Sequence, residues 1–360
     1  MKRILKAAAA VIAVAAAMSS CIDSNYDMSN IDATIGLGGD TLLLPTGNST
    51  ENIYLDEFID IDSCNFIHID SKTGDYILSA TSSNNSIEFR GTPSFLKDND
   101  IRVNLYSPVI NINFTSSGGD RLNGLFRSVD GNGKTMATVH IPSTPLPRGN
   151  SVVSIRTDDR KAKGDTITIK ASDLQVLLHH IPDHITFSNS RAIIETFSIN
   201  TPLSFGKNAY ITYKDSMDGW HDTLRKLSFR NTADGRPDGR IVLTADFSNK
   251  VPLYLKVTAY GIGTAGDSIS TERLRVSVDR DIMASADGIQ AAVTPLKITL
   301  EPLDNTVFRE LDGLRLVFRT STDNPAGPEV TGVIINARHQ TVTATNITAR
   351  IIGKVVGNFN

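Results

Sequence analysis

The chain has 360 residues, with 36 Lys+Arg against 39 Asp+Glu and a formal net charge of −3 at pH 7. This small acid excess argues against a nucleic-acid-binding protein, because such proteins normally carry a basic patch. The length predicts two or three domains, and two cysteines are too few for a disulfide framework or a cysteine-based metal site.

The first residues have the three parts of a secretion signal. Lys2, Arg3 and Lys6 precede an apolar run over 7–18, and small residues follow before a cysteine. The run is shorter than the roughly 20 residues that a membrane-spanning helix needs. We therefore expect residues 1–20 to be removed, which leaves 33 Lys+Arg against 39 Asp+Glu and a net charge of −6.

The cut site Met18-Ser19-Ser20-Cys21 resembles the lipobox of bacterial lipoproteins, in which Leu, then Ala or Ser, then Gly or Ala precede the cysteine. Met18 keeps the first position apolar, and Ser20 keeps the third position small. The resemblance implies cleavage between Ser20 and Cys21 and transfer of a diacylglycerol to the Cys21 thiol, which anchors the protein in a membrane. An ordinary signal peptide followed by an unrelated cysteine is the alternative.

Residues 22–35 are polar and lack a hydrophobic period, so we predict a flexible tether there. Asp23 and Asp27 resemble the acidic residues that direct some Bacteroidetes lipoproteins to the cell surface, but they do not form a dense acidic run. A solvated linker is the favoured interpretation. Beyond the tether, we expect an N-terminal β-sandwich region over 36–230 and a C-terminal β-sandwich domain over 240–360. The polar, Gly-rich stretch between them is the expected boundary.

Alternating apolar and polar residues predict strands with one buried face along most of the chain. The clearest segments are 101–105, 109–114, 166–169, 253–257, 274–278 and 314–318. Short helical segments are expected at 171–178, where Ser172 is placed to cap the helix, and at 305–311. Each helical segment follows a similar series of strands, so we predict an all-β fold of tandem immunoglobulin-like sandwiches with few short helices.

The segment His179-His180-Ile181-Pro182-Asp183-His184 is the densest group of candidate metal ligands. A metal site needs ligands that converge on one point. His179 and His180 would point to opposite faces of a strand, and Pro182 interrupts any helix that would align His180 with His184. We therefore predict a surface turn here and no metal site.

The segment 213–222 holds the single tryptophan of the chain next to acidic residues. An exposed Trp220 could stack on a sugar ring while carboxylates bond the sugar hydroxyls. On this interpretation Tyr213, Asp218 and Trp220 contact a ligand. The alternative is a buried Trp220 that packs at the seam between two sandwiches.

Enzyme motifs are missing from the sequence. Acidic residues are scattered and form no recognisable hydrolase pair, and the chain has no nucleophile elbow, phosphate loop or zincin motif. The Gly-rich stretch 261–266 lies between strands and is predicted to be a hairpin loop. Cys64 is expected to be a half-buried strand residue. We therefore predict no catalytic residue and no cofactor.

The lipobox, the tether 22–35 and the all-β remainder together resemble uncharacterised outer-membrane lipoproteins of Bacteroidales, which carry immunoglobulin-like sandwiches. The resemblance implies a lipid-anchored, non-enzymatic protein of the outer membrane that acts as a binding or structural module for a glycan or an envelope protein. One alternative is a subunit of a fimbria-like assembly that polymerises by strand donation, with 36–60 or 347–356 as the donor strand. A weakly paired terminal strand would favour that alternative. A glycan-active hydrolase is the third hypothesis.

Overall fold

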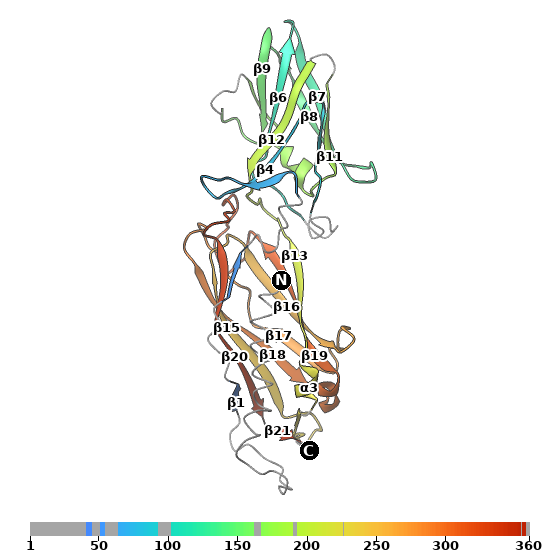
Figure 1. Cartoon of the computed structure of the whole chain (residues 1–360), viewed down its shortest axis with the longest axis vertical. Coiled ribbons are helices and arrows are strands. Elements are labelled where there is room, and N and C mark those ends of the chain that lie inside the picture. Colours follow the sequence, from blue (N-terminus) through green and yellow to red (C-terminus); the bar gives the residue numbers. More distant parts are fainter. Residues whose placement is uncertain are drawn as a thin grey trace.

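The computed structural model describes residues 41–44, 51–54, 64–92, 102–161, 167–189, 193–225, 227–353 and 355–357. The predicted signal peptide, Cys21 and the tether lie outside these residues. Two β-sandwiches are placed end to end along the long axis of the molecule (Figure 1). The predicted all-β class is confirmed, since the described residues add only one short α-helix and two 3-10 turns to the strands.

The N-terminal sandwich packs a six-stranded sheet against a four-stranded sheet. Its strands are β3 (Ile67–Ile69), β4 (Tyr76–Ser82), β5 (Ser86–Glu88), β6 (Val109–Ser116), β7 (Arg121–Val129), β8 (Thr135–Pro145), β9 (Gly149–Arg156), β10 (Ile167–Lys170), β11 (His184–Asn189) and β12 (Ile193–Pro202). The order is β10-β9-β6-β12-β4-β3 in the larger sheet and β5-β11-β7-β8 in the smaller one.

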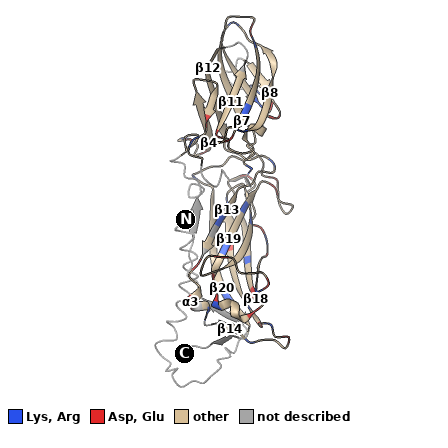
Figure 2. Ribbon diagram, turned by 90° about the vertical axis from the view of Figure 1, so that its right-hand side faces the viewer, with Lys and Arg blue, Asp and Glu red and all other residues tan. Residues whose placement is uncertain are grey.

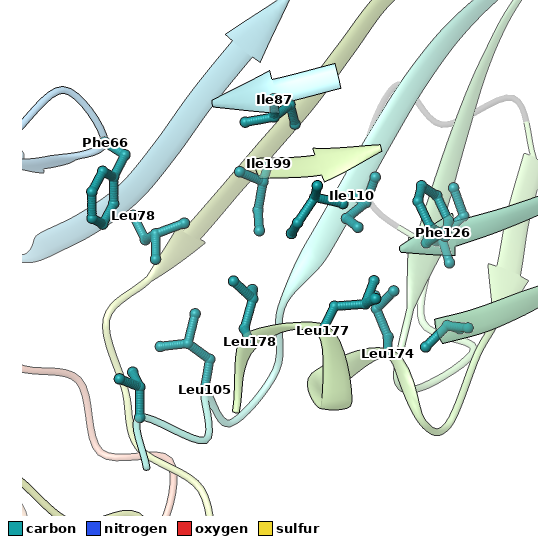
Figure 3. Packing of buried hydrophobic residues seen from close by; sticks show 14 of the residues in the cluster. Phe66, Leu78, Ile87, Leu105, Ile110, Phe126, Leu174, Leu177, Leu178 and Ile199 are labelled. Atoms are coloured by element: carbon teal, nitrogen blue, oxygen red, sulfur yellow. The ribbon is translucent and has the colours of Figure 1, made fainter. Parts of the chain in front are cut away.

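The core of this sandwich follows directly from the period of its strands. In β6, every second side chain is buried, as the alternation in the sequence predicts. Phe126, Phe187 and Phe197 meet between the sheets, with ring centroids 4.5 to 6.4 Å apart. The 3-10 turn η2 (Leu174–Leu178) closes the lower end and points its leucines into the core (Figure 3). Each such buried side chain contributes about 1.5–3 kcal/mol.

The C-terminal sandwich includes the first two strands of the described chain. Its strands are β1 (Thr41–Leu44), β2 (Glu51–Tyr54), β13 (Thr212–Met217), β14 (Leu227–Phe229), β15 (Gly239–Asn249), β16 (Tyr254–Gly263), β17 (Leu274–Val278), β18 (Ala292–Pro302), β19 (Leu311–Ser321), β20 (Thr341–Gly353) and β21 (Val355–Gly357). The sheets are β1-β20-β15-β18-β17, in which β2 also pairs with β20, then β13-β19-β16, and the small pair β14-β21. The helical turns are α3 (His221–Leu224) and η3 (Asn305–Arg309).

The N-terminal strands β1 and β2 run along the outer edge of β20. β1 is antiparallel to Ala349–Ile352, and β2 is antiparallel to Thr341–Ala344. Between them β20 has a bulge at Asn346, which has a φ of 52° and whose side chain donates to Asp246 Oδ2 at 2.7 Å. The chain therefore enters the fold at the end of the C-terminal sandwich that is remote from the N-terminal one, and β2 brings it to the joint between the two.

Most of the predicted strands are present. β6, β10, β16, β17 and β19 cover five of the six segments, whereas residues 102–105 make only isolated bridges. The two predicted helices are the 3-10 turns η2 and η3. The predicted cap at Ser172 is wrong, because Asp173 occupies the cap position of η2 and its side chain makes no capping hydrogen bond.

The sheets divide the chain at a different place from the expected boundary. β13 pairs with β19 and β14 pairs with β21, so residues 212–229 belong with the C-terminal strands. The polar stretch 231–239 is a turn between β14 and β15, closed by a bridge from Asn231 to Pro237. Gly, Asn, Asp and Pro favour tight turns as well as linkers. The change from one sandwich to the other falls between β12 and β13.

Backbone pairing continues through the joint between the sandwiches. Residues 203–205 bond to 104–106 on one side and to 332–335 on the other, with Tyr106 N to Ser204 O at 2.9 Å and Ile335 N to Leu203 O at 2.8 Å. Ile335 is fully buried and belongs to the core of the N-terminal sandwich. The joint is therefore a packed, hydrogen-bonded structure and not a free linker.

Candidate functional site

Trp220 lies inside the C-terminal sandwich and not on its surface. Only 7% of the residue is exposed, and it shares a core cluster with Leu224 and Phe308. Its backbone N–H donates to Asp312 O at 2.8 Å, and its carbonyl accepts from Leu224 N at 2.9 Å. The indole Nε1 has no hydrogen-bond partner among the described residues. This placement corresponds to the packing alternative, although the contact is within one sandwich and not at the seam.

Trp220 offers a direct spectroscopic test of this placement, because it is the only tryptophan of the chain. We expect native emission that is blue-shifted and poorly quenched by acrylamide, and a red shift on unfolding. Trp220→Phe is expected to cost less than a truncation to alanine, since it keeps most of the ring and removes the unpaired N–H. Emission near that of free tryptophan in the native state would place the indole in solvent.

The other two predicted ligand contacts, Asp218 and Tyr213, lie close to Trp220 in the chain. Asp218 is exposed, next to Gly219, which has a φ of 86°. Tyr213 is placed by its backbone in β13, opposite Phe318 of β19, and its side chain lies outside the described residues. A ligand contact at Asp218 and Tyr213 stays a prediction, and the indole face of Trp220 is not available to it.

The histidine segment forms the connection from η2 to β11. His179 and His180 are half-buried, and His184 Nδ1 lies 3.2 Å from Asp183 Oδ2. Burial lowers the pKa of His179, and electrostatic interactions with Arg102 and with the neighbouring His180 act in the same direction. Among the described residues, no group of three His, Cys, Asp or Glu side chains is arranged to hold a metal ion.

Several carboxylates are engaged in holding turns. Asp70 Oδ1 accepts from Lys72 N and Thr73 N at 2.8 and 2.9 Å, and Asp287 Oδ1 accepts from Ile289 N and Gln290 N at 2.8 Å. These backbone hydrogen bonds lower the pKa of both carboxyls. A general acid requires the opposite shift, so these two groups act as structural anchors of their loops.

The end of the N-terminal sandwich opposite the joint is here called the distal tip, and it consists of residues 116–121, residues 145–150 and Ile193 (top of Figure 1). Its first turn is fixed by Ser116 Oγ, which donates to Asp120 Oδ2 at 2.8 Å and accepts from Gly118 N at 3.1 Å. Leu146 N donates to Asp120 O at 2.9 Å and ties the two turns together. Ile193 is 69% exposed. The tip is thus an ordered surface with an accessible apolar side chain.

Comparison with known proteins finds a solved structure with a similar fold but no matching family. No protein-family model and no curated protein sequence matches the chain. A crystal structure of a protein from Parabacteroides distasonis that is described as secreted aligns with a TM-score of 0.56 and 11% identity, over 87% of this chain and 99% of that one. The tandem CBM22 domains of Paenibacillus barcinonensis Xyn10C align with a TM-score of only 0.18 and 8% identity, over 86% of this chain and 99% of theirs.

The likeness to the Parabacteroides distasonis protein extends over both sandwiches and supports the shared all-β architecture. The chain therefore resembles a secreted Bacteroidales protein in fold. No helix in the described part of the chain has the length and hydropathy required to cross a bilayer.

Proposed function

We propose that this protein is a lipid-anchored, non-enzymatic protein of the cell envelope that holds its N-terminal sandwich away from the membrane as a binding module. The single observation that carries the proposal is the path of β1 and β2. Thr41 pairs with Ile352 at the remote end of the C-terminal sandwich, and Tyr54 pairs with Thr341 near the joint. An anchor that precedes β1 in the chain is thereby joined to the end of the molecule opposite the distal tip.

The joint supports this arrangement because hydrogen bonds link the two sandwiches across it. The Asn336 side chain donates to Thr73 O at 3.0 Å and to Asp75 Oδ1 at 2.8 Å, and Ala337 N donates to Gly74 O at 2.9 Å. These bonds link the β3–β4 turn of one sandwich to the loop before β20 of the other. A continuous core across the joint would transmit the orientation of the lower sandwich to the upper one.

An outer-membrane location is part of the proposal. It is supported by the sequence Met18-Ser19-Ser20-Cys21 and by the fold likeness to a secreted protein of a Bacteroidales species. A non-enzymatic role is part of the proposal because the sequence carries no nucleophile elbow, phosphate loop or zincin motif. The expected partner is a glycan or another envelope protein, which the distal sandwich would contact.

The anchor is tested by Cys21→Ser in the full chain. We expect this variant to lose incorporation of labelled palmitate and to leave the membrane fraction, because the thiol that receives the diacylglycerol is gone. Cys64→Ser is the matched control, and it should keep both the label and the membrane association. A Cys21→Ser protein that still incorporates palmitate and sediments with membranes would contradict the lipoprotein assignment.

A second candidate function is a subunit of a fimbria-like assembly, and the edge of β20 favours it. β1 and β2 have four residues each, so the outer edge of β20 is covered by two short strands. An incoming strand could replace them and extend the sheet. In contrast, β20 is paired along both edges, which counts against 347–356 as the donor strand.

Locking β1 in place tests this second candidate. Leu43 lies opposite Arg350, so Leu43→Cys with Arg350→Cys in a Cys64→Ser background can form a cross-strand disulfide. If strands exchange, the reduced protein forms oligomers that grow with concentration and time, and the oxidised protein stays monomeric. A reduced protein that remains monomeric in size-exclusion chromatography at all concentrations would count against assembly through this edge.

A further inference from the structure

The face of the six-stranded sheet that points away from its partner sheet carries a row of uncharged polar residues that crosses five strands. Ser154 and the hydroxyl oxygen of Thr168 are buried in this row, Asn111 and Ser198 are half-buried, and Thr81 is exposed. The registers align Thr168 of β10 with Ser154 of β9, Ser154 with Asn111 of β6, Asn111 with Ser198 of β12, and Ser198 with Thr81 of β4. All five lie in one line perpendicular to the strands, because directly opposed residues in a sheet share a face.

The same chemistry continues toward the distal tip. The next row holds the polar Asn113 and Thr196 beside the apolar Val152, and the row beyond it holds Asn150, Thr115 and the exposed Ile193. Thr115 Oγ1 donates to Asn150 Oδ1 at 3.0 Å and also contacts the carboxylate of Glu195, which sits at a bulge in β12. These rows together are here called the amide–hydroxyl face.

Charged residues are confined to the rim of this face. Glu195 lies at its distal end, and Lys170 and Arg156 form a pair at the end nearer the joint. The outward face of the four-stranded sheet differs, because Arg127 stands in its middle between Thr186 and Thr138. Figure 2 shows β12 mostly in tan and a basic position on β7, in agreement with this contrast.

Hydrogen bonds within the face pair some of its donors and acceptors and leave others without a partner among the described residues. Ser154 Oγ donates to Asn111 Oδ1 at 2.5 Å, and Ser198 Oγ lies 3.5 Å from the Asn111 carbonyl oxygen. The hydroxyl oxygen of Thr168 is buried and has no partner in the described part of the chain. Asparagine amides and hydroxyls can both donate and accept, so the accessible part of the face presents mixed donors and acceptors, at Asn111, Asn113, Thr196, Ser198 and Thr81.

We propose that the amide–hydroxyl face binds a neutral polysaccharide chain. Sugar hydroxyls are mixed donors and acceptors without charge, which is what this set of side chains complements. A protein surface that selects a charged polymer would carry opposite charges in its centre, and the central rows carry none. The face spans several strands, so it suits an extended chain held by many weak hydrogen bonds, direct or through water.

This inference rests on the proposed function and deepens it, because it names the ligand class and the surface of the binding module. It does not involve Trp220, which is buried in the other sandwich. It also does not depend on the anchor, since the face belongs to the N-terminal sandwich and is independent of residues 1–40. Failure of glycan binding and failure of anchoring are therefore separate outcomes.

Native gel electrophoresis in gels that contain polysaccharide tests the proposal on the full chain with Cys21→Ser. The probes are barley β-glucan, xyloglucan, amylopectin and yeast mannan, with polygalacturonate as the charged comparison. We expect retardation by at least one neutral polymer and none by polygalacturonate. If no neutral polymer retards the protein, or if only polygalacturonate does, the proposal is overturned.

Matched substitutions locate the binding surface. Asn113→Arg places a long cation in the centre of the face at a half-exposed position, and we expect affinity for the retarding polymer to fall at least tenfold. Thr138→Arg adds the same side chain to the outward face of the other sheet and should leave retardation unchanged. Equal behaviour of the two variants would overturn the proposal. Thermal unfolding of both variants shows whether the fold is kept.

A second variant tests the central row without adding bulk. Asn111→Ala removes the amide that accepts from Ser154, and we expect a loss of affinity of about threefold to tenfold, the range of one net hydrogen bond. Thr186→Ala is its control on the opposite sheet. An Asn111→Ala variant that melts like the parent protein and binds with unchanged affinity would contradict a role for the row.

Discussion

Phe187→Ala is expected to lower the free energy of unfolding by about 3–5 kcal/mol, because it opens a large cavity in the core. The ring is fully buried, and its centroid lies 4.5 Å from that of Phe126 and 6.5 Å from that of Phe114. Urea denaturation followed by circular dichroism measures the change. A cost below about 1 kcal/mol would mean that the two sheets do not pack around this ring as the structure has it.

Gly124 lies against the ring of Phe187. A Cβ at this position would lie 2.2 Å from Phe187 Cε2 and 2.8 Å from Ser188 O, so Gly124→Ala alone should cost about 1–3 kcal/mol through overpacking. In the double variant with Phe187→Ala the clash with the ring is absent, and the combined cost should be smaller than the sum of the two. Gly131→Ala, which meets nothing within 4 Å, is the control. Additive costs would contradict the contact.

Asn336→Ala is the second substitution with a large expected effect, because it removes the side chain that links the two sandwiches. Asn336 is 3% exposed, and its Oδ1 accepts from Arg338 N at 2.9 Å in addition to the two bonds that its Nδ2 donates. Partners left unpaired in a buried site cost about 1–3 kcal/mol each. We expect a loss of at least about 2 kcal/mol.

The cooperativity of unfolding tests the joint more directly than the loss of stability does. In calorimetry, the parent protein should unfold in one transition if the joint couples the sandwiches, and Asn336→Ala should broaden or split it. Lys72→Ala is the control, because Lys72 is exposed and contributes only its backbone carbonyl to Arg338. Two separate transitions in the parent protein would show that the sandwiches are independent.

The strands were predictable from local sequence because burial alternates residue by residue. The alternation predicts strands in Val109–Ser116 and Leu274–Val278, and both segments are strands. The helical segments were predicted in the right places but are 3-10 turns of five residues each. A segment this short does not repay the cost of forming the first turn of an α-helix. A periodic pattern gives the element type, whereas the length available between neighbouring strands decides how far a helix extends.

The joint and the amide–hydroxyl face could not be predicted in this way, because both depend on pairing between distant segments. Asn336 bonds to Asp75, and Thr168 shares a row with Thr81 through three intervening strands. Each residue alone reads as an ordinary polar position of a solvated strand or turn. The pairing of β1 with β20 joins residues near opposite ends of the chain, and nothing in a local window indicates it.

Trp220 shows the limit of inference from composition. A single tryptophan beside Asp218 and Tyr213 fits a sugar site and a core position equally well. Its backbone hydrogen bond to Asp312 and its packing with Phe308 show that Trp220 occupies the core position. Asn111 and Asn113, which we propose to contact a glycan, have no tryptophan beside them in the sequence, and only the register of the sheet brings them together.

The central claim is that the C-terminal sandwich faces the membrane and the distal tip faces away from it. Fluorophores on single cysteines test this in the lipidated protein with Cys64→Ser, reconstituted in vesicles that contain headgroup spin-labelled lipids. Asp234→Cys lies in the turn beside the end of β20, and Ser117→Cys lies at the distal tip. We predict strong quenching of the probe at position 234 and little at position 117. Equal quenching at both positions, or stronger quenching at 117, would contradict the account.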